Sequence, residues 1–474
     1  MDTRALRLRD IWTFLIIATL ILSFIFGGLV RESSAMTAEE EKKLGKRILF
    51  EIEKQVEWVR DPTIQVFIDK IGNSIVREAG PTPFEFKFYV IKAQDPNAFA
   101  IPGGSIFVTT GLIVLADNDQ EIAGVLSHEI SHVTGRHIDQ LIEKSKRLSL
   151  ASLAAMLLGA LAARGGAGTE AIAATAMATT ESLMLKYSRE NETDADQNGL
   201  YHMIKAGYDP NGMISFLTKI QRMSLALAPK VPAYLLTHPA LENRIGLIEN
   251  LMQIGGKPSG PFRKVGNLRR VQIKALVEEK DSDVAVSHFG SMVKANPQDV
   301  DGVYGLGLAY ERMGRLDKSI EVFQNGLSLS PKDPDLLREL GIVYFLSGRL
   351  GQAAENLEAA RSFSKDDRET DPLILYYLGR TFQEKGDFAS ALPLFLGVRK
   401  QLAEFPDVYN NLGSVYGRMG EKGPSHFNFG KHFKLIGDRQ SALLHFREAD
   451  RWLEKGGREK EETRQEIKEL TEIK

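Results

Sequence analysis

The segment from Ser127 to Val133 contains the pattern His-Glu-x-x-His. On a helix, His128 and His132 face the same side one turn apart, so both imidazole rings can reach one metal ion. Glu129 projects about 60° around the axis from His132, close enough to take a proton from a water molecule at that metal. The chain has no cysteine, so any metal must be held by histidine or carboxylate side chains. The pattern predicts a metal-dependent hydrolase.

Further ligands are available in the segment 187–196, which reads Tyr-Ser-Arg-Glu-Asn-Glu-Thr-Asp-Ala-Asp. Two histidines supply half of a tetrahedral zinc site, and a catalytic site needs a third protein ligand beside water. Glu192 and Asp196 face the same way if this segment is helical. One carboxylate can then bind the metal while the other accepts the free N–H of a ligand histidine. The spacing leaves the two roles open, and a solvated acidic helix face is the alternative.

The elements that position these residues follow from hydrophobic spacing. They are helices over 37–60 and 67–75, strands over 84–90 and 105–110, and a turn-rich connection over 97–104. Asn118 resembles a helix N-cap and starts the helix that carries the two histidines. We expect the preceding strand to present an exposed edge, where Phe107, Val108 and Thr109 bind an extended substrate. The apolar stretch 148–163 is expected to be a core helix, with a membrane-facing or gating segment as the alternative.

Three segments, NAFAIPGGSIFVTTGL, LSHEISHVTGRH and YSRENETDADQNG, together resemble a known family. They are similar to landmarks of the zinc metallopeptidases that include HtpX, the Oma-type proteases and the CAAX prenyl endopeptidases. The resemblance covers about residues 40–250. It implies one zinc ion held by His128, His132 and Glu192, with Glu129 as the catalytic base and Asp196 behind the ligands.

The same resemblance assigns Thr237-His238-Pro239 and Arg244 to a motif that returns to the active site. His238 and Arg244 are therefore the candidates for stabilising the oxyanion. A second role for His238 is that of a fourth ligand, which would displace the water and hold the enzyme latent. His137 lies about 140° from His132 on an ideal helix. We expect it, like His202, to be structural or exposed.

A regular repeat occupies the second half of the chain. The pairs Leu306-Gly307, Leu340-Gly341, Leu378-Gly379 and Leu412-Gly413 recur at nearly equal intervals, of which the middle one is slightly longer. An interval of about 34 residues is typical of tetratricopeptide repeats, in which small residues let paired helices approach. Phe429-Gly430 follows after only half that interval, which leaves the end of the array open. Such repeats bind peptides or protein partners on a concave face.

The N-terminus indicates export. Three arginines precede an uncharged run from Ile11 to Val30, and small residues follow up to Ala35. This segment, residues 1–36, is either a signal peptide cleaved after Ala35 or a retained membrane anchor. Both alternatives place the rest of the chain outside the cytoplasm. The net charge of −2 predicts no attraction to nucleic acid.

A length of 474 residues predicts two or three domains. We expect a mainly α protein: an α+β zincin-type metallopeptidase domain over 37–255, an all-α repeat solenoid over 265–455, and a charged helix or tail over 456–474. This combination resembles the bacterial envelope proteases of the beta-barrel assembly-enhancing type. The resemblance implies a periplasmic zinc endopeptidase that degrades misfolded or stalled outer-membrane proteins, with the repeats recruiting substrate or assembly machinery. The alternatives are a membrane-anchored protease acting on inner-membrane or secreted proteins, and a chaperone or scaffold in which the repeats do the main work.

Overall fold

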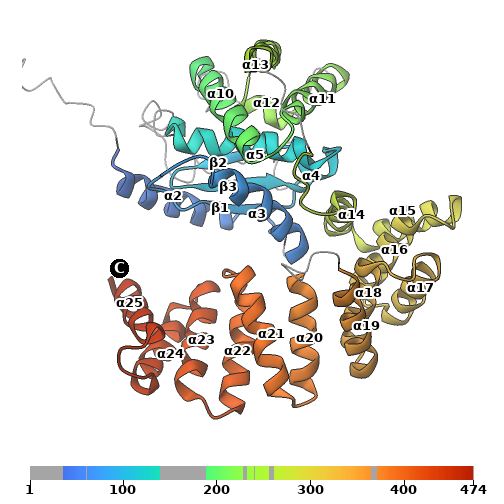
Figure 1. Cartoon of the computed structure of the whole chain (residues 1–474), viewed down its shortest axis with the longest axis vertical. Helices are drawn as coiled ribbons and strands as arrows, with labels where there is room; N and C mark the ends of the chain where they lie inside the picture. Colours follow the sequence, from blue (N-terminus) through green and yellow to red (C-terminus); the bar gives the residue numbers. More distant parts are fainter. Residues whose placement is uncertain are drawn as a thin grey trace, which may run out of the picture.

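The computed structural model describes most of the chain as two helical bodies, one above the other in Figure 1. The described residues are 36–59, 61–138, 188–227, 232–239, 241–255, 261–364 and 371–472. The predicted export segment and the apolar stretch 148–163 lie outside them. Among the helices that are described, none combines the length and hydrophobicity needed to cross a membrane.

A three-stranded sheet lies at the centre of the upper body. Its strands are β1 (Lys87–Ile91), β2 (Ala98–Ile101) and β3 (Ser105–Thr109), in the order β1-β3-β2. β3 is parallel to β1 and antiparallel to β2. β2 lies within the segment predicted as a turn-rich connection. The chain reverses after it at Gly103 and Gly104, whose positive φ angles of 86° and 99° favour glycine.

This strand order corrects the prediction of a substrate-binding edge. Because β2 folds back onto β3, both sides of β3 already pair with a neighbouring strand. Phe107, Val108 and Thr109 are all 0% exposed. They are core residues, so the predicted exposed edge at these positions is wrong.

The two faces of the sheet pack against different helices. Phe99, Ile101 and Phe107 share a core with α2 (Ala38–Glu53). Ala98, Ala100 and Ile106 belong to the larger core of α3 (Pro62–Val76) and α5 (Asp119–Thr134). This alternation follows from the period of two along each strand. The packing of one sheet face against α5 holds this helix against the sheet.

α5 begins where the sequence predicts, because the Asn118 side chain accepts hydrogen bonds from the Gln120 and Glu121 N–H groups. The helices around it are α4 (Thr110–Leu115), α10 (Arg189–Lys205), α11 (Asn211–Leu227), α12 (Ala233–Thr237) and α13 (Leu241–Gly255). A Cβ added at Gly124 of α5 would lie 2.9 Å from the Met213 backbone of α11, and one at Gly199 of α10 would lie 3.1 Å from the backbone of α5. Glycine thus permits the close approach of α5 to α11 on one side and to α10 on the other.

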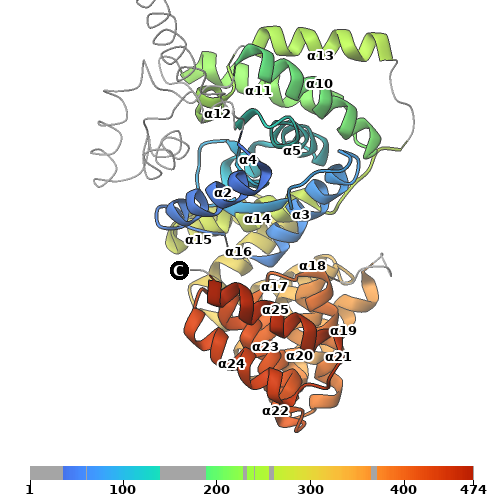
Figure 2. The same cartoon turned by 90° about the vertical axis from the view of Figure 1, so that its left-hand side faces the viewer.

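The lower body is a curved array of helix pairs (Figures 1 and 2). Its helices are α14 (Leu268–Glu279), α15 (Ser282–Ala295), α16 (Val300–Arg312), α17 (Leu316–Leu329), α18 (Pro334–Leu346), α19 (Leu350–Phe363), α20 (Pro372–Glu384), α21 (Phe388–Gln401), α22 (Pro406–Arg418), α23 (Lys422–Leu435), α24 (Arg439–Trp452) and α25 (Arg458–Glu472). The mainly α fold, with a small sheet followed by helical repeats, is confirmed.

Glycine–aromatic contacts join the repeat helices. A Cβ at Gly379 of α20 would lie 2.8 Å from the ring of Phe395 on α21, and Gly413 of α22 has the same relation to Phe429 of α23. Gly430 of α23 then meets Phe446 of α24 at 2.6 Å. α23 is therefore the second helix of one pair and the first helix of the next. This sharing explains why the last interval of the repeat is halved.

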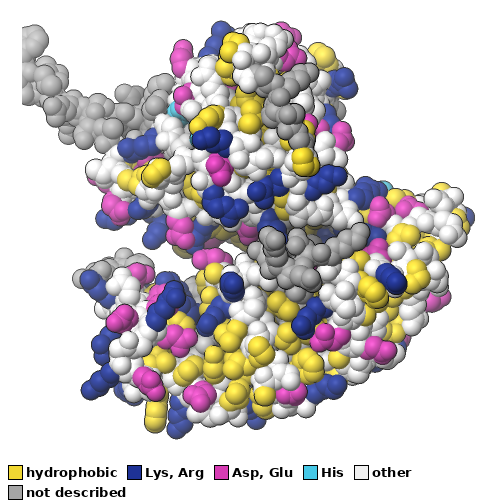
Figure 3. All heavy atoms as spheres, viewed as in Figure 1, with side chains coloured by type: hydrophobic (Ala, Val, Ile, Leu, Met, Phe, Trp, Pro, Cys, Tyr) yellow, Lys and Arg dark blue, Asp and Glu magenta, His cyan; other side chains and the backbone are white. Residues whose placement is uncertain are grey.

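The two bodies meet through α3 and the first helices of the array. Lys274 of α14 is 4% exposed, and its ammonium lies 2.8 Å from Asp61 at the start of α3 and 3.0 Å from Glu339 of α18. Farther along, Lys87 of β1 lies 3.1 Å from Glu404 in the repeats. Figure 3 shows charged side chains along the junction and hydrophobic side chains over α20 to α22.

Candidate metal centre

α5 presents both histidines of the His-Glu-x-x-His pattern to one buried space. The Nε2 atoms of His128 and His132 lie 3.0 Å apart, and the rings are at most 1% exposed. Glu129 is 0% exposed and belongs to the same turn of the helix. The spacing argument from the sequence is therefore realised in the fold.

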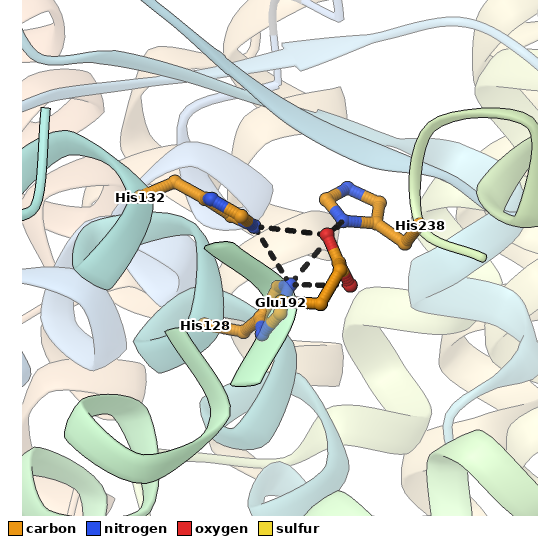
Figure 4. Close-up of side chains that lie close together, drawn as sticks. All are labelled: His128, His132, Glu192 and His238. Carbon is orange, nitrogen blue, oxygen red and sulfur yellow. Dashed lines mark hydrogen bonds and ion pairs between the residues drawn. The ribbon is translucent and has the colours of Figure 1, made fainter. Parts of the chain in front are cut away.

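Two further side chains complete the cluster (Figure 4). Glu192 comes from α10; its Oε1 lies 3.4 Å from His132 Nε2 and its Oε2 lies 3.6 Å from His128 Nε2. His238 follows α12, and its Nδ1 lies 3.2 Å from His128 Nε2 and 3.0 Å from Glu192 Oε1. Four donors from three helical segments thus converge.

These four donors fit a tetrahedral metal ion. Bonds of about 2.0–2.1 Å to nitrogen and oxygen place the ligands of a tetrahedral zinc ion roughly 3.3 Å apart. The donor atoms of His128, His132, Glu192 and His238 all lie within 4.8 Å of one another. The set of nitrogen and carboxylate ligands, without sulfur, suits zinc and other borderline divalent cations.

The electrostatics of the cluster favour a cation. Burial, assisted by neighbouring His128, lowers the pKa of His132 well below its usual value and so keeps this imidazole in the neutral form that binds metals. Burial opposes the charge of His238, but Glu192 and Glu129 outweigh it and raise the pKa of His238 to about 9. The carboxylates of Glu192 and Glu129 therefore favour a positive charge at this buried position.

Arg244 of α13 holds two carboxylates in place. Its Nη1 lies 2.7 Å from Glu192, and its Nε and Nη2 each lie 2.8 Å from an oxygen of Asp196. Burial alone would raise the pKa of Glu192, but Arg244 and His238 hold it well below its usual range. Because its guanidinium is engaged in this way, the structure gives Arg244 a positioning role and does not support the predicted oxyanion role.

Asp196 lies where the resemblance implies. Its Oδ1 is 2.9 Å from His128 Nδ1, the ring nitrogen that faces away from the cluster. Burial opposes its charge, but Arg244 and His128 lower the pKa of Asp196 to about 2. An ionised Asp196 accepts the N–H of His128 and leaves Nε2 of that ring available as a ligand.

His238 and Glu129 face each other across the site. His238 Nε2 lies 3.2 Å from Glu129 Oε1, and the His238 ring stacks on Tyr234 with centroids 4.7 Å apart. Both His238 and Glu129 are 0% exposed. His238 thus touches the expected catalytic base with one nitrogen and the metal-binding cluster with the other.

His137 is the site residue that sequence reasoning missed. It is 5% exposed, and its Nδ1 lies 3.0 Å from His132 Nδ1 while its Nε2 lies 3.2 Å from Asp194. The helical angle was misleading because α5 ends at Thr134 and Arg136 has a φ of 52°. Gly135, a frequent helix-ending residue, was the available signal. His202 is a buried residue of α10 outside the metal-binding cluster.

Comparisons with known proteins agree with this geometry. Residues 64–252 match Peptidase family M48, and residues 271–334 and 312–367 match the tetratricopeptide repeat. A protein of Vibrio cholerae serotype O1 with the provisional name beta-barrel assembly-enhancing protease is 33% identical over 292 residues, which are 60% of each chain. The beta-barrel assembly-enhancing protease of Escherichia coli K12 is 29% identical over 221 residues, 46% of this chain and 45% of that one.

A mitochondrial relative shares the same region. The mitochondrial metalloendopeptidase OMA1 of Schizosaccharomyces pombe is 30% identical over 190 residues, 39% of this chain and 52% of that one. The chain thus spans about half the length of the curated relatives it matches. The predicted combination of domains is confirmed: the chain carries a metallopeptidase domain of Peptidase family M48, followed by tetratricopeptide repeats.

Proposed function

We propose that this chain is a zinc-dependent endopeptidase that cleaves extended or misfolded proteins in the bacterial cell envelope. The observation that carries the proposal is the convergence of His128, His132 and Glu192, with buried Glu129 beside them. A scaffold whose repeats did all the work would have no need of a complete ligand set with an intact catalytic base. The rival interpretation as a chaperone or scaffold is therefore the weaker one.

Each side chain has a distinct task in peptide hydrolysis. When bound, zinc supplies a Lewis acid that polarises a carbonyl and lowers the pKa of water. His128 and His132 would hold it through Nε2, and Asp196 keeps the proton of His128 on Nδ1. Glu129 accepts a proton at its carboxylate from the attacking water and delivers it to the leaving amine nitrogen.

His238 gives the resting chain a means of latency. A catalytic zinc site keeps one position for water beside three protein ligands. His238 Nδ1 lies 3.0 Å from Glu192 Oε1 and thus occupies the corresponding fourth position in the cluster. Removal of His238 from this position would leave room for water there.

Location and partners follow from sequence and relatives together. The arginines before Ile11–Val30 support export, with inner-membrane anchoring as the alternative. The names of two relatives refer to beta-barrel assembly, which suggests outer-membrane β-barrel proteins as substrates and their assembly machinery as a partner of the repeats. Cell fractionation with N-terminal sequencing of the mature protein distinguishes a soluble periplasmic enzyme from an anchored one.

The test of the activity compares the parent chain with Glu129→Gln. Casein cleavage should fall by about 10²- to 10⁴-fold, the usual contribution of a general base. Bound zinc should stay at one ion per chain, because Glu129 is not among the four clustered donors. His202→Ala, on the same α10 helix as Glu192, is a matched control that should retain activity. Equal cleavage by the parent and Glu129→Gln would refute the mechanism.

A further inference from the structure

His137 lies directly behind a metal ligand. His132 uses Nε2 within the donor cluster, so its proton is on Nδ1, which donates to His137 Nδ1 at 3.0 Å. The proton of His137 is therefore on Nε2, 3.2 Å from a carboxylate oxygen of Asp194. The three side chains form one line of hydrogen bonds that runs outward from the metal centre to the half-exposed Asp194.

We propose that His137 is a positioning residue, which fixes the tautomer and orientation of the ligand His132, and that Asp194 fixes His137 in turn. The inference rests on the proposed metallopeptidase function. α10 then supports both ligand histidines of α5. Asp196 reaches His128 directly at 2.9 Å, whereas Asp194 reaches His132 through the ring of His137. Ligand histidines usually need such a partner on the nitrogen that faces away from the metal.

The backbone after α5 is shaped to place this ring. A Cβ at Gly135 would lie 2.6 Å from His137 Nε2, so glycine leaves the room that the ring occupies. Arg136 has a φ of 52°, a left-handed conformation that costs an arginine of order 1 kcal/mol. The turn is held because Arg136 Nε lies 2.9 Å from the buried carboxylate of Glu41 on α2. A strained turn anchored by a partly buried ion pair, with a contact to a candidate ligand at its end, is typical of a functional constraint.

The alternative is that His137 only fills space. A leucine has similar bulk and would satisfy a packing role, whereas it cannot accept the N–H of His132. An asparagine offers Oδ1 near the place of the His137 Nδ1 and can accept that N–H. The two substitutions therefore separate positioning from packing.

The experiment measures zinc affinity by competition with a chromophoric chelator, in the full exported chain carrying Glu129→Gln to prevent self-cleavage. His137→Leu should weaken zinc binding by about 10- to 100-fold, and His137→Asn should restore most of the affinity. Asp194→Ala should give a smaller loss, because Asp194 reaches His132 only through the ring of His137. The visible absorption spectrum of the Co²⁺-substituted protein should shift in His137→Leu and return in His137→Asn.

Two controls separate this inference from the proposed function. If His128→Ala binds zinc as tightly as the parent, the metal centre itself is wrong. If His128→Ala loses zinc but His137→Leu keeps parental affinity and an unshifted Co²⁺ spectrum, the centre stands and the role of His137 is overturned. Should His137→Leu fail to fold, as judged by circular dichroism, parental zinc affinity in Asp194→Ala overturns the role of His137 as well, because the Asp194 side chain is 49% exposed and its removal leaves the fold intact.

Discussion

The ion pairs of Lys274 with Asp61 and Glu339 should stabilise the contact between the repeats and the metallopeptidase domain. Lys274 lies between Asp61 of α3 and Glu339 of α18, at 2.8 and 3.0 Å. Burial opposes the charge of Glu339, but Lys274 and Arg338 lower its pKa from 4.5 to about 2. At about 1.4 kcal/mol per pKa unit, this shift corresponds to about 3 kcal/mol of stability at neutral pH.

Lys274→Met removes one of the two cations that produce this effect. Glu339 keeps Arg338 at 2.6 Å, so the loss should be below the roughly 3–5 kcal/mol typical of a broken buried ion pair. We expect a decrease of about 2 kcal/mol in the free energy of unfolding at pH 7. Urea unfolding of the full chain followed by circular dichroism measures it. Lys318→Met, at an exposed lysine of α17, should stay within about 0.5 kcal/mol of the parent.

The pH dependence gives the refutation. A carboxylate whose pKa is lower in the folded state contributes stability above its unfolded pKa of 4.5, and this contribution disappears as the pH falls from 4.5 towards 2. The difference between parent and Lys274→Met should therefore be largest at pH 7 and shrink below pH 4.5. A difference at pH 7 that stays under about 0.5 kcal/mol, the ordinary scatter of surface substitutions, contradicts the argument. So does a difference that is the same at pH 7 and pH 3.

Three other outcomes are expected. His238→Ala should raise casein cleavage by about tenfold, because the variant loses the contact between His238 and the charged Glu192, worth roughly 1.5 kcal/mol, that would hold the latent state. Unchanged cleavage excludes latency through this residue. Gly379→Ala should destabilise the repeats by about 1–3 kcal/mol in thermal unfolding, since its Cβ meets Phe395 at 2.8 Å, whereas Gly351→Ala, with open space around it, should not. Asp196→Asn should weaken zinc binding by about 10- to 100-fold in chelator competition, and an unchanged affinity would remove its role behind His128.

The candidate metal site could be predicted because its geometry is local. His128 and His132 share one helical turn, and Glu192 and Asp196 share another, so residue spacing determines which way they point. The helical repeats were likewise visible from the Leu-Gly interval. What brings α5 and α10 together is the close packing at Gly199, which no spacing rule reveals.

The misses come from non-local structure and from a break in helical geometry. β2 has only four residues beside a Pro-Gly-Gly turn, and its pairing places β3 in the centre of the sheet. His137 was misplaced because the helix was extended past Thr134, where Gly135 and Arg136 turn the chain back. The Lys274–Asp61 pair joins residues 213 positions apart, and neither has a sequence pattern that marks it.

α3 contacts both the repeat array and the helix α5, which carries His128 and His132. Asp61 at its start pairs with Lys274 of the repeats, while Ile64 and Ile71 along it lie in the same core as Ile130 of the metal-binding helix α5. The side chain that pairs with the start of α3 comes from α14, and Lys274 in turn contacts Glu339 of α18. A ligand that bound at this end of the array would compete with Asp61 of α3 for Lys274. The contact of α3 with the repeats and its packing against α5, the helix of His128 and His132, thus depend on one structural element.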